Sequence, residues 1–235
     1  MHFHHLQYLP LAPLFFVLLV GLFAALVLIV QLRILQYAYT RLGVGPNTAL
    51  LLLFGSLIGS YINLPVAQFP EQSVVVGQEV SYFGMRYIEP VLADWPGTIV
   101  AVNVGGAVIP TLLSLYLLGK NGIWFSGAVV TAVAAAICHY MATPVAGVGI
   151  EVPIFTPPIA AAIAAMVVSW RNAPPLAYIG GSLGTLIGAD LLNLPSIPSL
   201  GAPVASIGGA GTFDGIFVTG IMAVLLAGFA GRRRV

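Results

Sequence analysis

Two aspartates lie inside strongly apolar stretches of the sequence, where an acidic side chain is unexpected. Asp190 stands in "TLIGADLLNLP" (185–195) and Asp214 in "SIGGAGTFDGIFVTG" (206–220). An ionised aspartate in the middle of a bilayer costs about 2.5–3.5 kcal/mol, so such residues usually have a function. Two carboxylates held close together share one proton, and such a pair can bind a cation, exchange protons or activate water. We therefore take Asp190 and Asp214 as a candidate proton or cation site, or as a catalytic dyad.

Several polar and glycine residues are expected at a similar depth to the two acids. The candidate ligand-binding residues, including glycines whose backbone can come close to a bound group, are Asn103, His139, Asn193, Gly208, Gly209 and Gly211. Glu151 and Asp94 are expected on the same side of the membrane. Simpler roles remain open, because an aspartate can cap a helix end or bond nearby backbone, and a histidine can pack at an interface.

The composition identifies the class of protein. Of 235 residues, 59% are hydrophobic and only 6% are charged, and the mean hydropathy is +1.03. These values are far from those of soluble domains and indicate an integral membrane protein. The net charge of +1 gives no field to attract nucleic acid, so no nucleic-acid partner is expected.

Cysteine and histidine usage predicts neither a metal site nor a cofactor. Cys138 is the single cysteine, so the chain cannot form an internal disulfide or a CxxC zinc site. His2, His4 and His5 lie close together, and we interpret them as part of a tail rather than as metal ligands.

Apolar stretches of about 20 residues predict the membrane-spanning helices. The seven candidates are 11–30, 48–66, 99–118, 122–142, 153–170, 174–194 and 207–230. The fold class expected from them is all-α, a polytopic integral membrane helical bundle of about seven transmembrane helices in a single domain, 1–235.

The basic residues predict the orientation of the bundle, because cytoplasmic connections are rich in Lys and Arg. Seven of the eight basic residues fall on one side of the membrane that the predicted spans define, and only Arg86 falls on the other side. The seven are Arg33, Arg41, Lys120, Arg171, Arg232, Arg233 and Arg234. We expect an N-terminus outside and a C-terminus in the cytoplasm, in a prokaryotic cytoplasmic membrane.

Two pairs of similar segments suggest an internal repeat. "GSLIGSYINLP" (55–65) matches "GTLIGADLLNLP" (184–195), and "VNVGGA" (102–107) matches "ASIGGA" (205–210). Because an even number of spans separates the copies, they share one direction across the membrane. The predicted plan is a parallel three-plus-one-plus-three repeat, comprising 11–118, a linker helix over 122–142, and 153–231. The alternative is convergent use of small residues for close helix packing, as at Gly180, Gly184 and Gly188.

Prolines and the longest connection give two further local predictions. Pro110 and the pair Pro157–Pro158 lie inside predicted spans, where they are expected to kink or break a helix. The connection over 67–98 contains "SVVVGQEVSYFGMRYIEP", whose Gly-Gln break separates two β-rich runs. This pattern predicts an outer hairpin or a plain loop.

The sequence resembles the bacterial and archaeal membrane protein family known as domain of unknown function 1614. The resemblance covers about 97–231 and rests on "VNVGGAVIPTLLSLYLL", "GVGIEVPIFTPP", "PPLAYIGGSLGTLIGADLLNL" and "GAPVASIGGAGTFDGIFVTGI". It implies a polytopic membrane protein and assigns no catalytic residues.

A weaker resemblance is to the intramembrane aspartic proteases, which place one aspartate in a Gly-x-Gly-Asp motif and another after an aromatic residue. Here Ile187 replaces the first glycine of that motif, "FD" provides the aromatic-Asp pair, and "PPLAY" is only loosely similar to a Pro-Ala-Leu motif.

Three functions follow from these patterns. The leading one is a transporter-like protein in which the aspartates handle a proton or cation for coupled movement of an unknown small solute. The alternatives are an intramembrane aspartic-protease-like enzyme and a structural or assembly subunit of a membrane complex. We expect the protein to be embedded in a lipid bilayer. Its Gly-rich helix faces are compatible with the formation of homo-oligomers.

Overall fold

Helices dominate the computed structural model, which describes residues 13–70, 72–82, 85–145, 149–209 and 215–230. The α-helices are α1 (Pro13–Arg41), α2 (Pro46–Gly59), α3 (Ile109–Asn121), α4 (Trp124–Met141), α5 (Thr156–Val168), α6 (Ala173–Thr185) and α7 (Gly215–Ala230). Three short irregular helices accompany them: the π-helices η1 (Val104–Val108) and η2 (Leu186–Asp190), and the 3-10 helix η3 (Leu191–Leu200). Each α-helix falls within or beside one predicted span.

Three helical stretches in the described part of the chain are long and apolar enough to cross a membrane. They are Val20–Arg41, Trp124–Met141 and Ala173–Pro198. Shorter apolar helices are Pro46–Gly59, Thr156–Val168 and Gly215–Phe229. The length and composition of these helices are compatible with a membrane protein. The number of times that the chain crosses the membrane stays a prediction.

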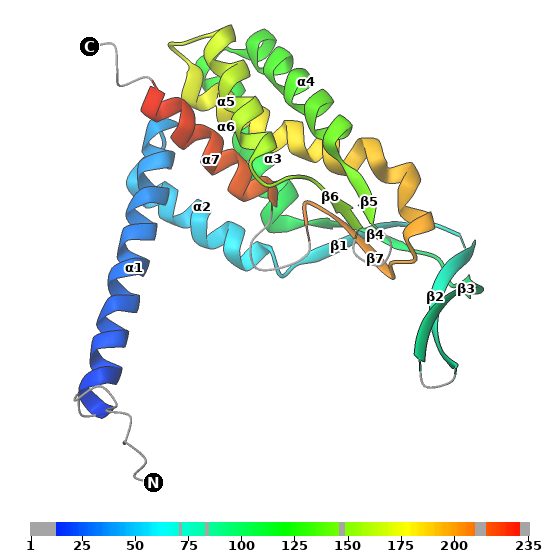
Figure 1. Cartoon of the computed structure of the whole chain (residues 1–235). Coiled ribbons are helices and arrows are strands. Elements are labelled where there is room, and N and C mark those ends of the chain that lie inside the picture. The colour runs from blue at the N-terminus through cyan, green and yellow to red at the C-terminus, as the bar shows by residue number, and fades with distance from the viewer. Residues whose placement is uncertain (1–12, 71, 83–84, 146–148, 210–214, 231–235) are drawn as a thin grey trace.

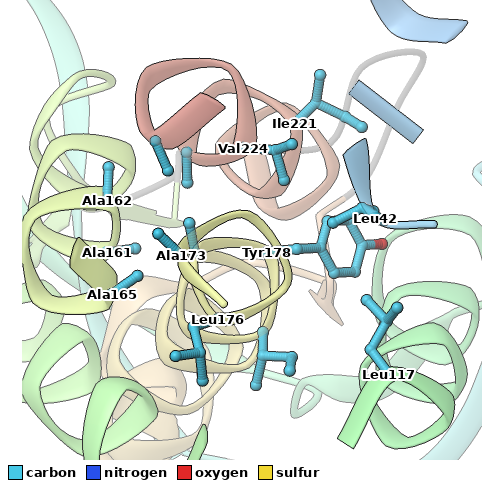
Figure 2. Close-up of a cluster of buried hydrophobic side chains, with 14 of the residues drawn as sticks. Leu42, Leu117, Ala161, Ala162, Ala165, Ala173, Leu176, Tyr178, Ile221 and Val224 are labelled. Atoms are coloured by element: carbon cyan, nitrogen blue, oxygen red, sulfur yellow. The ribbon is translucent and has the colours of Figure 1, made fainter. Parts of the chain in front are cut away.

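Helix α6 forms the centre of the bundle (Figure 1). It packs against α3, α4, α5 and α7, and nearly all of its residues are buried. A helix that is apolar on every side is stable only when other helices surround it. Figure 2 shows the resulting core, in which Tyr178 and Leu176 of α6 lie among small residues of α5 and apolar residues of α3 and α7.

Glycines hold α6 close to α4, as the spacing of Gly180, Gly184 and Gly188 predicted. A methyl group added at Gly180 would meet Val130, and one added at Gly184 would meet Ala134. At Gly188 the added atom would lie 2.8 Å from both Cα of Ala135 and Cβ of Cys138. The role of these glycines in close helix packing is therefore confirmed.

Helix α1 leaves the bundle and extends away from it (Figure 1). Among the side chains of α1 that the structure describes, only those of Ala38 and Tyr39, near its C-terminal end, are buried; the helix packs against α2 and α7. Leu22, Phe23 and Leu26 are each more than half exposed. The N-terminal half of α1 therefore presents apolar side chains outward, as a helix in contact with lipid would.

The protein is mostly helical, as predicted, but it is not all-α, because strands gather at one end of the bundle (Figure 1). The strands are β1 (Asn63–Gln68), β2 (Gln72–Tyr82), β3 (Met85–Trp95), β4 (Ile99–Asn103), β5 (Thr143–Val145), β6 (Gly149–Glu151) and β7 (Val204–Ile207). The apolar runs at 63–68, 99–103 and 204–207 were included in or next to predicted spans. A short apolar run rich in β-branched residues cannot be assigned to helix or strand from periodicity alone.

A three-stranded sheet in the order β1-β4-β7 connects distant parts of the chain. Strands β1 and β4 are antiparallel, with Asn63 opposite Asn103. Strands β4 and β7 are parallel, with Ile99 opposite Val204. The remaining strands form two hairpins, β2-β3 and β5-β6.

The long connection forms the predicted hairpin, with a displaced turn. Strand β2 pairs with β3 over the whole of both strands, and Tyr82 lies opposite Met85. Gly77 and Gln78, where the sequence suggested a break, are inside β2, opposite Pro90 and Glu89.

The predicted spans break near Pro110 and near Pro157–Pro158, as expected, and the prolines lie at the starts of α-helices rather than at kinks inside them. Pro110 lies in the first turn of α3, and Pro157 and Pro158 lie in the first turn of α5. A proline in the first turn of a helix loses no hydrogen bond, since the N–H there has no partner within the helix. Each proline therefore marks the start of a helix that is shorter than the predicted span.

The segments of the proposed repeat fold differently in one pair, and in the other pair they share only a strand at the start. After Gly59 the chain leaves α2 and enters strand β1, whereas after Gly188 it continues in π and 3-10 turns. The other pair contains β4 and β7, which are neighbours in the sheet. Their register pairs Val102 with Ile207, two residues from the sequence match. The repeat stays a prediction.

Candidate functional site

Asp190 lies where regular helix ends. Helix α6 changes at Leu186 into one π-helical segment, which ends at Asp190, and then into the 3-10 helix η3. Pro195 and Pro198 in η3 have no N–H to continue an α-helical pattern. Irregular backbone at membrane depth occurs where it is buried in protein or lines a cavity. The sequence thus places its acid where one continuous helical stretch changes from π to 3-10 geometry, and π-helical segments are frequent at functional sites.

Asn193 stabilises the backbone where the helix changes from π to 3-10 geometry. Its Nδ2 donates hydrogen bonds to the carbonyl oxygens of Gly188 and Ala189, at 2.9 Å each. The side chain is buried and replaces the helical N–H donors that the π and 3-10 turns remove. Asn193 was predicted as a ligand-binding residue, and its amide nitrogen is used instead to hold the backbone beside Asp190.

A glycine turn faces Asp190. The backbone N–H of Gly208 donates to Oδ2 of Asp190 at 2.7 Å. Gly208 and Gly209 have φ angles of +92° and +83°, a region that favours glycine. Gly208 also lies against the chain at Ala107, where an added Cβ would be 2.6 Å from the backbone nitrogen. The predicted departure of this Gly-rich segment from regular helix is confirmed at both residues.

The Asp190 carboxylate lacks an ionic partner in the described part of the chain. There the only ion pair joins Arg86 to Glu79 on the exposed hairpin, at 3.3 Å. The carboxylate of Asp190, which is half-buried, is bonded to a neutral backbone donor. A half-buried carboxylate with one neutral donor retains oxygen lone pairs that can accept a proton or a cation.

Asn103 is the buried centre of a polar network next to the Gly208 turn. It is fully buried, and its Nδ2 donates to the carbonyl of Ser60 at 2.7 Å and to Oδ1 of Asn63 at 3.1 Å. Its Oδ1 accepts from the N–H of Gly106 at 2.9 Å. Asn103 therefore joins the end of α2, strand β1 and the start of η1, and its predicted location near the acid is supported by the contact of Gly208 with Ala107.

Ser206 extends the network toward Asp190. Its hydroxyl oxygen lies 2.6 Å from Oδ1 of Asn63 and 2.7 Å from the carbonyl oxygen of Gly209. A hydroxyl has one hydrogen and donates to only one of these oxygens at a time. The other oxygen is then available to a donor or cation from outside the network. Ser206 and Asn63 were not predicted as site residues, although both stand in the matched repeat segments.

A cavity of about 210 Å³ lies beside these groups. Asp190, Ser206 and Gly209 contribute to its wall, together with apolar residues of η3 and β7 and with Gly149 and Ile150 of β6. Carboxylate, hydroxyl and carbonyl oxygens are the donors that hard cations prefer, and they also hold water and protons. The residues of the wall thus include one acid, Asp190, two residues with neutral oxygen atoms that could bind a cation, Ser206 and Gly209, and several apolar residues.

The other predicted site residues are placed as follows. His139 is exposed on α4, one residue from buried Cys138. Gly211 and Asp214 lie outside the described residues, so pairing of Asp190 with Asp214 stays a prediction. In the described part of the chain, no group of three His, Cys, Asp or Glu side chains lies together as a metal site would require.

Comparison with known proteins gives one match. The family described as "Protein of unknown function (DUF1614)" matches residues 57–226, well over half of the chain. No curated protein and no solved structure matches the sequence. The matched range contains Asp190, Asn103 and the three strands that carry the polar network, β1, β4 and β7.

Proposed function

We propose that this chain, which belongs to the DUF1614 family, is a transporter-like membrane protein in which Asp190 binds a proton or small cation during coupled movement of a solute. One observation carries the proposal. Asp190 lines a cavity at the point where the helical stretch changes from π to 3-10 geometry. Among the described residues, no cationic side chain forms an ion pair with its carboxylate. A structural acid in that position would be expected to have an ionic partner, because an unpaired charge is costly away from water.

The surrounding groups support ion binding over a purely structural role. Gly208 N–H holds one carboxylate oxygen in place, and the oxygens of Ser206 and Gly209 stand near the same cavity. Asn103 and Asn193 keep the two irregular backbone segments rigid. Ion binding at such a site needs little rearrangement, since the oxygen donors are already positioned.

Ion binding by Asp190 is tested by thermal unfolding of the purified protein. We expect the melting temperature of the wild type to respond to NaCl in place of choline chloride, or to pH, because a ligand that binds the folded state stabilises it. The Asp190→Asn variant should lose this response. Asparagine keeps an oxygen that accepts from Gly208, so the fold should persist. Glu79→Gln, on the exposed hairpin, is the matched control and should respond as the wild type does.

Transport is tested separately in proteoliposomes with an entrapped pH dye and with radioactive Na⁺. Ion flux above protein-free vesicles should disappear in Asp190→Asn and persist in Glu79→Gln. Equal flux and equal thermal responses in the wild type and Asp190→Asn would remove Asp190 from the mechanism.

We also propose an orientation with the sheet end of the bundle outside the cytoplasm. Lys120 donates to the carbonyl of Gly43 at 2.7 Å, so the basic connections α1-α2 and α3-α4 lie together at the end opposite the sheets. Basic connections are expected on the cytoplasmic side.

Labelling of single cysteines tests the orientation. In a Cys138→Ser background, Ser81→Cys on the hairpin should react with a membrane-impermeant maleimide in intact cells. Lys120→Cys should react only after permeabilisation. Both native residues are exposed, so accessibility to solvent does not distinguish them. The reverse pattern would contradict the proposed orientation.

A further inference from the structure

Helices α1, α2 and α7 enclose an apolar groove of about 400 Å³ on the side of the bundle where α1 separates from it. Apart from Gln31, Ser56, Ser60 and Gly105, every residue of its wall is apolar. Representative wall residues are Leu28, Phe54, Leu57, Phe217, Ile221 and Met222. The groove does not include Asp190 and is separate from the candidate ion site.

The serines in the groove do not make it a polar site. The hydroxyl of Ser56 donates to the carbonyl of Gly105 at 2.9 Å, and that of Ser60 donates to the carbonyl of Leu57 at 2.7 Å. Both hydroxyl protons are therefore used inside the protein. The groove surface at this point suits an apolar group that needs no hydrogen bond.

The size of the groove limits what can fill it. The volume lies in the range of about 300–1,000 Å³ that is typical of small-molecule sites. Because its wall is almost wholly apolar, a flexible unbranched hydrocarbon chain suits it better than a polar ligand.

A cationic side chain stands in a hollow next to the groove. Arg33 lines this second hollow, between α1 and α7, and Ile34 and Leu225 contribute to the walls of both. Arg33 is exposed and forms no ion pair with another described residue. A guanidinium group prefers phosphate among its partners, so a molecule with an apolar chain and a phosphate would complement both hollows.

We infer that the groove between α1, α2 and α7 binds an acyl chain of an anionic membrane phospholipid, whose phosphate is held by Arg33. The inference does not depend on the proposed function of Asp190. Bilayer lipid is the natural source, because the groove lies beside the part of α1 that presents exposed apolar residues, such as Leu22 and Phe23.

The test uses vesicles that contain a trace of phosphatidylglycerol with a diazirine in its acyl chain. After illumination, labelled residues are identified by mass spectrometry of peptides. We expect Phe54 and Leu57 in the groove to be labelled more than Leu51, which lies on the same helix outside the groove and is 70% exposed. Because this comparison uses the wild type, it does not depend on the folding of a variant. Equal labelling of the three residues would overturn the inference.

Three variants and a second lipid test the parts of the inference. Leu57→Trp should fill the groove and reduce its labelling several-fold, whereas the neighbouring Ile58→Trp, outside the groove, should not. In the wild type, phosphatidylglycerol should label the groove more than phosphatidylcholine with the same chain, and Arg33→Gln should remove this preference. Labelling that is insensitive to Leu57→Trp, equal for both lipids, or obtained only with a free fatty acid would overturn the assignment.

Discussion

Replacement of Gly188 by alanine is expected to lower the stability of the folded protein strongly, by about 1–3 kcal/mol or more, which is typical of overpacking a close-packed core. The added methyl group would overlap the carbonyl oxygen of Ala135 and lie 2.8 Å from Cβ of Cys138. Neither atom can move without displacing α4. Helices α4 and α6 would have to separate, and Asp190, two residues away, would shift with them.

Thermal unfolding in detergent measures this effect, with Gly119→Ala as the matched control. Gly119 lies in α3, and a methyl group there meets nothing within 4 Å. Alanine is a better helix former than glycine by about 1 kcal/mol, so the control should unfold at an equal or higher temperature. If Gly188→Ala were as stable as Gly119→Ala, the close approach of α6 to α4 would be contradicted.

Replacement of Asn103 by leucine is the second substitution with a large expected effect on stability. Leucine has a similar volume, but it leaves the N–H of Gly106 and the carbonyl of Ser60 without their partner. Each buried polar group that loses its hydrogen bond costs about 1–3 kcal/mol, so the expected loss is roughly 2–5 kcal/mol. We also expect the Na⁺ or pH response to weaken, because the Gly208 turn rests on the segment that Asn103 holds.

Asn47→Leu provides the matched control for Asn103→Leu. Asn47 is exposed in the first turn of α2, so its substitution should change the melting temperature little. Similar melting temperatures for both variants would show that the network around Asn103 contributes little to stability.

The helical part of the fold was predictable because the sequence contains strong local signals for it. Long apolar stretches locate the helices, and the four-residue spacing of glycines from Gly180 to Gly188 identifies the face of α6 that contacts α4. The departure of the segment at Gly208 and Gly209 from regular helix was also predicted, whereas Asp190 was expected in a regular helix. Each of these signals depends on residues that lie close together in the sequence.

The sheet and the polar network were not predictable in the same way, because they depend on pairing between distant segments. Asn63 appears as an ordinary polar residue after a helix, and Ser206 as a small residue before a glycine pair. They become site residues only when β1, β4 and β7 align. Pro110 seemed to lie inside a span for a related reason: the strand β4 and the π-helix η1 that precede α3 are apolar, like the beginning of a long helix.

The parallel pairing of β4 with β7 has a consequence for biosynthesis. Thr98, just before β4, bonds through its hydroxyl to the carbonyl of Ala202, 104 residues later in the chain. At typical rates of synthesis of about 5–20 residues per second, β7 emerges roughly 5–20 s after β4. During that interval the edge of β4 that will pair with β7 has no strand beside it, while β1 already covers the other edge. The sheet, and with it the contact between Gly208 and Asp190, can therefore close only after β7 and Gly208 have been synthesised.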